Sequence, residues 1–230
     1  MFLRRGTRPA LISPRYAVVW MLALLILTIA VTGCNIEFNP KPIPQPFPGT
    51  GPLPTSGFEH AFEPALWNDG ALIQNSTNCY AYMLNRPWGF PAGHKLQPGE
   101  LHGNPLSSAS DVNAFRIIEL VRQDAIFEGF IFEDAPPDQA CPAGTYKVAL
   151  VVDPGVDYHW YRQNPDGTWS GKGGHGAATD LDASGNVITD PRTADRNYGF
   201  INYYEFGGFF CVRSEEHTSE LQSPCNLVCR

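Results

Sequence analysis

A chain of 230 residues in which 43% are hydrophobic is long enough to bury one core of ordinary size. It carries 16 basic and 23 acidic residues, and ten basic and twenty acidic residues remain when the two terminal segments described below are set aside. This acidic balance disfavours nucleic acid and anionic membrane surfaces as partners, because both would repel the chain.

Residues 1–33 have the pattern of an export signal. Four arginines precede an apolar run over residues 16–31, which ends in the sequence Val31-Thr32-Gly33-Cys34. These four residues resemble the lipobox of bacterial lipoproteins. The resemblance implies cleavage after Gly33, a lipid on Cys34, attachment to a membrane through that lipid, and a place in the bacterial cell envelope. The alternative is an uncleaved membrane anchor, because the apolar run is only slightly shorter than a spanning helix needs.

Residues 34–57 are predicted to form a linker. Seven prolines lie between Asn39 and Ser56, and a segment so rich in proline is extended and semi-rigid rather than folded. We expect this linker to hold the following domain away from the membrane.

The stretch from Asn75 to Leu84 places a cysteine at the expected start of a helix. Asn78 is a residue type that caps helices, and Cys79 follows it in the first turn. Unpaired N–H groups at a helix start stabilise negative charge, which lowers the pKa of a thiol. The sequence therefore predicts that Cys79 is a nucleophile.

The rest of the domain is predicted to be one amphipathic helix followed by strands. Ser110 and Asp111 would cap the helix, whose apolar stripe is Val112, Phe115, Ile117, Ile118 and Val121. Strands are expected at residues 146–152, 158–163 and 202–212. A tight turn at residues 164–167 leads into the return strand of a hairpin, which begins with residues 168–170. Helices followed by an antiparallel sheet predict an α+β domain.

Residues 213–230 resemble the translation of a common sequencing adapter. The runs from Arg213 to Ser223 and from Leu227 to Arg230 carry this resemblance. We therefore expect the folded domain to span residues 58–212 and the natural chain to have been truncated near Val212.

Three cysteines remain in the expected domain, and their number favours one disulfide and one free thiol. Cys141 lies in a proline-rich loop and Cys211 in an apolar run, so these two would be bridged if their segments meet. The alternative is that both are buried thiols. The chain contains no CxxC and no HExxH motif, so no metal or other cofactor is expected.

The order of the polar residues after Cys79 is that of a papain-like site. His159 lies on a predicted strand eighty residues downstream, and the polar segment 179–182 follows it. The segments 78–82, 157–162, 169–170 and 182–185 resemble bacterial proteins related to papain-like cysteine peptidases and amidases, in the neighbourhood of the NlpC/P60 cell-wall hydrolases. The resemblance covers residues 75–212 and implies a papain-like fold.

The resemblance also implies roles for particular residues. Cys79 would be the nucleophile and His159 the general base. Asp180 is our choice for the residue that orients the imidazole, with Asp182 and His175 as rivals.

The oxyanion of the reaction would be stabilised by the backbone N–H of Cys79, helped by the side chain of Asn78 or Gln74. The expected function is hydrolysis of amide bonds at the cell envelope, and peptidoglycan peptides are one substrate that fits this location. The alternative is a non-catalytic lipoprotein that binds sugar or peptide through an aromatic groove, with Trp88, Trp160, Trp169 and several tyrosines as its candidates. In that case Cys79 would be paired with another cysteine.

Overall fold

A computed structural model describes residues 52–70, 72–88 and 90–213 of the chain. The expected signal, the lipidation site at Cys34, most of the linker and residues 214–230 lie outside the described residues. In the part that the structure describes, no helix has the length and apolar character required to cross a membrane.

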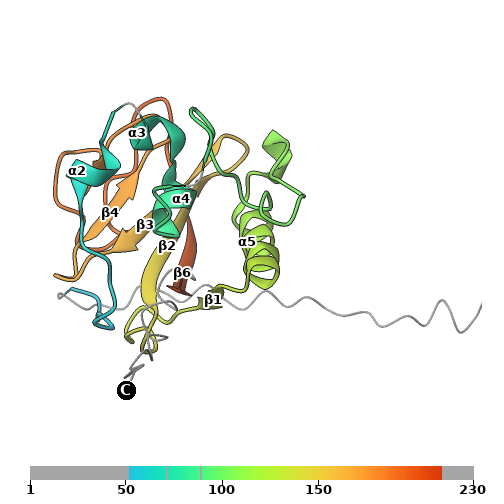
Figure 1. The fold of residues 1–230 in the computed structure, drawn as a ribbon. Helices are drawn as coiled ribbons and strands as arrows, with labels where there is room; N and C mark the ends of the chain where they lie inside the picture. Colours follow the sequence, from blue (N-terminus) through green and yellow to red (C-terminus); the bar gives the residue numbers. More distant parts are fainter. Residues whose placement is uncertain (1–51, 71, 89, 214–230) are drawn as a thin grey trace, which may run out of the picture. The chain divides into compact units, whose positions relative to one another are not determined.

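The domain is of the α+β class, with its helices before and beside one antiparallel sheet (Figure 1). The sheet has six strands in the order β1-β6-β2-β3-β4-β5. The helical elements are α2 (Pro64–Trp67), α3 (Ile73–Ser76), α4 (Cys79–Met83), the 3-10 turn η1 (Ala109–Asp111) and α5 (Ala114–Glu128). The strands are β1 (Ile131–Asp134), β2 (Tyr146–Asp153), β3 (Asp157–Gln163), β4 (Trp169–Lys172), β5 (Ala178–Thr179) and β6 (Glu205–Arg213).

Strand β2 lies at the centre of the fold and is buried on both faces. Because side chains alternate along a strand, Val148, Leu150 and Val152 belong to the core beneath α4 and α5. Ala149 and Val151 belong to a second core on the opposite face of the sheet. A strand covered on both faces reads as a continuous apolar run, which is how residues 146–152 appear in the sequence.

Helix α5 begins later than the sequence suggested. Its N-cap is Asn113, whose side chain accepts a hydrogen bond of 2.9 Å from the backbone N–H of Arg116. Ser108 and Asp111 instead form a capping box on the short turn η1. The helix ends at Glu128, and its C-cap Gly129 has a φ of 83°, which requires a residue that tolerates the left-handed region. Phe115, expected in the buried stripe, is 65% exposed.

Strand β4 is much shorter than β3. Pairing between them runs only from Tyr161 opposite Gly171 to Gln163 opposite Trp169. The first residues of β3 therefore extend beyond the end of β4, and this side of β3 is not paired with a strand there.

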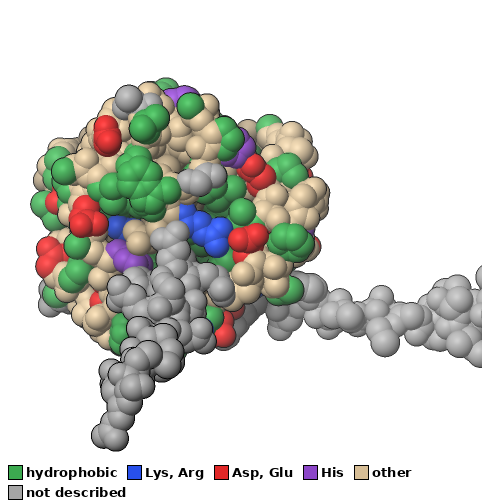
Figure 2. Space-filling model, in the orientation of Figure 1, with side chains coloured by type: hydrophobic (Ala, Val, Ile, Leu, Met, Phe, Trp, Pro, Cys, Tyr) green, Lys and Arg blue, Asp and Glu red, His purple; other side chains and the backbone are tan. Residues whose placement is uncertain are grey.

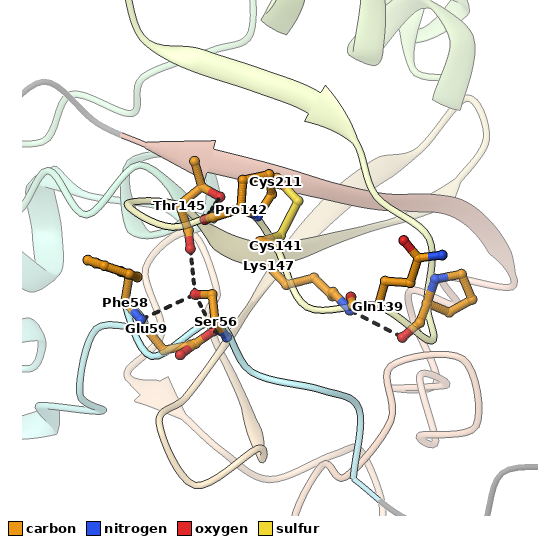
Figure 3. The surroundings of a disulfide bond; sticks show 10 residues. Ser56, Phe58, Glu59, Gln139, Cys141, Pro142, Thr145, Lys147 and Cys211 are labelled. Carbon is orange, nitrogen blue, oxygen red and sulfur yellow. Dashed lines mark hydrogen bonds between the residues drawn. A yellow bond between two sulfur atoms is a disulfide. The ribbon is translucent and has the colours of Figure 1, made fainter.

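A disulfide joins Cys141 to Cys211, with an S–S distance of 2.11 Å (Figure 3). It links the loop before β2 to strand β6. The fully buried Lys147 holds the same loop, because its ammonium donates hydrogen bonds to the carbonyl oxygens of Pro137 (3.1 Å) and Gln139 (2.6 Å). The bridge and the lysine together fix the irregular segment between β1 and β2.

Candidate functional site

The start of α4 is built as the sequence predicted. Asn78 is the N-cap, and its side-chain oxygen accepts a hydrogen bond of 3.1 Å from the backbone N–H of Ala81. Its side-chain nitrogen donates to the carbonyl oxygen of Leu96 at 2.7 Å, which anchors the cap to the following loop. Cys79 is therefore held in the first turn of the helix.

The Cys79 thiol is not a thiolate in this arrangement. It is 5% exposed and donates a hydrogen bond to the carbonyl oxygen of Tyr158 at 3.8 Å. Burial, followed by the negative charge of Asp157, raises the pKa of Cys79 to about 12, although the Trp160 N–H and the charge of Lys172 act in the opposite direction. The expectation of a lowered pKa was wrong because the helix start is buried against β3 rather than open to water.

His159 faces away from Cys79. Tyr158 and Trp160 belong to the core beneath α4, so their neighbour His159 points to the other face of β3. Its ring contacts Tyr161 and Tyr203, with centroids 4.7 and 5.8 Å away. It also packs closely on Gly171, where an added Cβ would lie 2.3 Å from its Nε2.

Burial lowers the pKa of His159 to about 4, so its imidazole is neutral near pH 7. Among the hydrogen bonds of the described residues, none joins His159 to Cys79. The expected pair is therefore not hydrogen-bonded in this structure.

A pocket of about 140 Å³ nevertheless brings several reactive groups together where β4 ends. Asp157 contributes the carboxylate of this pocket, which accepts hydrogen bonds of 2.8 Å from the Tyr203 hydroxyl and from the backbone N–H of Tyr158. The lining consists of Asn78, Cys79, Lys95, Gln97, Asp157, Tyr158, His159, Gly173, Gly174 and Tyr203.

Comparison with protein-family models gives no match, and no solved structure matches the chain. Insoluble matrix shell protein 1 of Ruditapes philippinarum is 36% identical to it over 152 residues, which are 66% of this chain and 88% of that protein. The chain belongs to the family of that shell protein. The name of insoluble matrix shell protein 1 refers to a matrix and to insolubility, and it mentions no catalytic activity.

The residues proposed to orient His159 lie elsewhere. Asp180 is not among the lining residues, and its backbone carbonyl accepts a hydrogen bond from the Ile188 N–H at 2.8 Å. The carboxylate of Asp182 accepts hydrogen bonds from the backbone of its own turn. His175 is exposed. The carboxylate that the sequence reasoning missed is Asp157, which stands two residues before His159 on the same strand.

The two proposed oxyanion residues also differ in position. Asn78 lines the pocket, but Gln74 does not. The side-chain nitrogen of Gln74 donates instead to the carbonyl oxygen of His175 at 3.2 Å, on an exposed part of the domain.

The expected aromatic groove does not contain all three tryptophans. Trp160 and Trp169 are fully buried, one in each core of the sheet, and only Trp88 is exposed, at 59%. On the face drawn in Figure 2, acidic side chains are spread among hydrophobic and neutral ones and form no continuous patch. Within residues 52–213, apart from the two undescribed positions, no group of three His, Cys, Asp or Glu is placed to hold a metal ion.

Proposed function

We propose that the domain is a cysteine hydrolase of amide bonds and that its α+β fold is papain-like. The observation that supports this most is the pocket at the end of β4, where Cys79 at a capped helix start and His159 on β3 line the same cavity. A thiol and a neutral imidazole that line one cavity are the two groups that nucleophilic attack on a carbonyl uses, once they come within hydrogen-bond reach of each other.

The reaction requires two side chains to turn from their resting contacts. The Cys79 sulfur leaves the Tyr158 carbonyl, and the His159 ring turns toward the pocket around the unpaired edge of β3. His159 then takes the thiol proton, and the sulfur bonds to the carbonyl carbon of the substrate. The amine leaves with the proton from His159, and water hydrolyses the thioester to a carboxylic acid and a free thiol.

Asp157 replaces Asp180 in this proposal as the carboxylate of the site, because Asp157 lines the pocket and Asp180 does not. Asn78 remains the candidate for stabilising the oxyanion. Gln74 is withdrawn from that role, since its side-chain amide bonds to the carbonyl of His175.

The test is release of amine from peptidoglycan fragments and from a panel of peptide amides. We expect Cys79→Ala to abolish release and His159→Gln to lower the rate at least about 100-fold, the usual contribution of a general base. His94→Gln is the matched control, because His94 pairs with Glu100 and does not line the pocket. Release that persists in Cys79→Ala would show that this thiol is not the nucleophile.

The second candidate is a non-catalytic protein that binds sugar or peptide. Two observations favour it: the raised pKa of Cys79, and the name of the related shell matrix protein. In this case Cys79 acts only as a hydrogen-bond donor to β3, and Trp88 is an exposed tryptophan available for contact. Co-sedimentation with insoluble peptidoglycan or polysaccharide that is lost in Trp88→Ala but kept in Cys79→Ala would support binding over hydrolysis.

We also propose that the chain is attached to the bacterial cell envelope through a lipid on Cys34. The support is the sequence Val31-Thr32-Gly33-Cys34 after a basic and apolar leader, followed by the proline-rich linker. In a bacterial host, Cys34→Ser should prevent maturation or release the protein from the membrane fraction. Unchanged processing and membrane attachment in that variant would contradict the proposal.

A further inference from the structure

Two lysine ammonium groups meet beside the start of α4. Lys172, at the end of β4, is fully buried, and Lys95 comes from the loop after α4 and lines the pocket. The Lys172 ammonium lies within hydrogen-bond reach of the carbonyl oxygens of Gln74 (2.8 Å), Thr77 (2.8 Å), Gly173 (3.3 Å) and Gly176 (3.2 Å). The Lys95 ammonium shares two of these acceptors, those of Gln74 (3.3 Å) and Thr77 (2.9 Å).

This pair of positive charges has no carboxylate partner among the described ion pairs, none of which involves Lys95 or Lys172. Because both nitrogens contact the same Thr77 oxygen, they lie within about 6 Å of each other. Burial, and then the charge of Lys95, lowers the pKa of Lys172 to about 8. The site therefore concentrates positive charge two residues before Cys79.

We propose that Lys172, with Lys95 beside it, is the positioning residue that supplies the positive charge for a thiolate at Cys79, the role that an imidazolium has in a papain-like site. The inference rests on the proposed function, because a thiolate matters only if Cys79 reacts. His159 is unsuited to this role in the resting fold, since it lies on the opposite face of β3 and is neutral.

The other groups around the thiol oppose a thiolate or stay neutral. Asp157 on β3 opposes a thiolate, and Tyr158 and Tyr203 keep their protons because burial raises the pKa of both hydroxyls. Lys95 lines the pocket with Cys79, Lys172 shares the Thr77 carbonyl with Lys95, and the charge of Lys172 acts to lower the pKa of Cys79. Removing it would leave the sulfur facing the Asp157 carboxylate with less compensating charge.

The experiment compares alkylation of Cys79 by iodoacetate, an anion, and by iodoacetamide, a neutral reagent of similar size. Local opening of the pocket and the thiolate fraction scale both rates alike, so their ratio reports the charge beside the sulfur, and the pH dependence of the iodoacetamide rate reports the pKa of Cys79. We expect Lys172→Met to lower the iodoacetate to iodoacetamide ratio about ten-fold and to move the pH dependence to higher pH, and Lys172→Arg, which keeps the charge, to stay within about two-fold of the parent ratio. A lowered ratio with an unchanged pH dependence would overturn the proposal.

Lys147→Met is the matched control. Lys147 is also fully buried, also bonded to backbone carbonyls, and also has a pKa lowered to about 8, but it lies next to the disulfide (Figure 3). Whatever its effect on stability, this variant should leave the iodoacetate to iodoacetamide ratio unchanged.

An unchanged ratio in folded Lys172→Met, or an equal fall in Lys147→Met, would overturn the proposal. If Lys172→Met does not fold, Lys95→Met takes its place, because Lys95 is less buried. We then expect the iodoacetate to iodoacetamide ratio to fall about three-fold. An unchanged ratio in Lys95→Met would overturn the proposal. A lowered ratio together with no amide hydrolysis in any variant would leave the charge assignment standing and reject the hydrolase instead.

Discussion

Replacing Cys141 and Cys211 together with alanine should destabilise the domain by about 4 kcal/mol. The bridge joins residues that are 70 apart in sequence, so it closes a long loop and removes a large part of the conformational freedom of the unfolded chain. The chain-entropy relation gives about 4 kcal/mol for a loop of this length at 25 °C. This is a large share of the roughly 5–15 kcal/mol that stabilises an ordinary domain.

The assay is urea unfolding without reductant, followed by tryptophan fluorescence, since Trp160 and Trp169 lie in the two cores. The double variant should shift the midpoint strongly to lower urea, and reduction with dithiothreitol should move the parent in the same direction. Cys79→Ala is the control, because it removes a buried sulfur without opening a loop. A loss below about 1 kcal/mol in the double variant would refute the reasoning, and would mean that the Lys147 contacts hold the loop without the bridge.

Two further predictions concern pH. The pKa of His159 is about 4 in the folded domain and near 6.5 when unperturbed, so the unfolded chain binds a proton that the folded domain does not. The free energy of unfolding should therefore fall by about 1–3 kcal/mol as pH drops from 6.5 to 4. His159→Gln should remove this loss, which urea midpoints measured at both pH values would show. The pKa of Lys147 is about 8 in the folded domain and 10.5 when unperturbed, so the free energy of unfolding should rise with pH between 8 and 10.5. Thermal melts of Lys147→Met should lack that rise. A pH profile of Lys147→Met identical to that of the parent would contradict this prediction.

The elements with strong local signals could be predicted from the sequence. Asn78 caps α4, the apolar run of β2 is a buried central strand, and β3 turns into β4 through a tight turn. These features depend on neighbouring residues and on hydrophobic pattern, which the sequence displays directly.

The geometry of the site could not be predicted in the same way. Both faces of β3 are covered, so Tyr158, Trp160 and Tyr161 show no alternation that would reveal on which face His159 lies. The Lys172 contacts are with backbone carbonyls of residues about a hundred positions away, and a carbonyl carries no sequence signal. Asp157 lies within segment 157–162, which carries part of the resemblance to papain-like peptidases and amidases. Its position in the pocket, however, depends on where strand β4 ends.

The early end of β4 also affects how the domain meets other chains. An unpaired strand side usually offers its N–H and C=O groups as a template on which another chain can add. Here the Asp157 carboxylate binds the Tyr158 N–H and the Cys79 thiol binds the Tyr158 carbonyl, so side chains block that template. The two outer strands, β1 and β5, are only four and two residues long. Within the described residues, growth of the sheet by strand addition is therefore discouraged at each of these places.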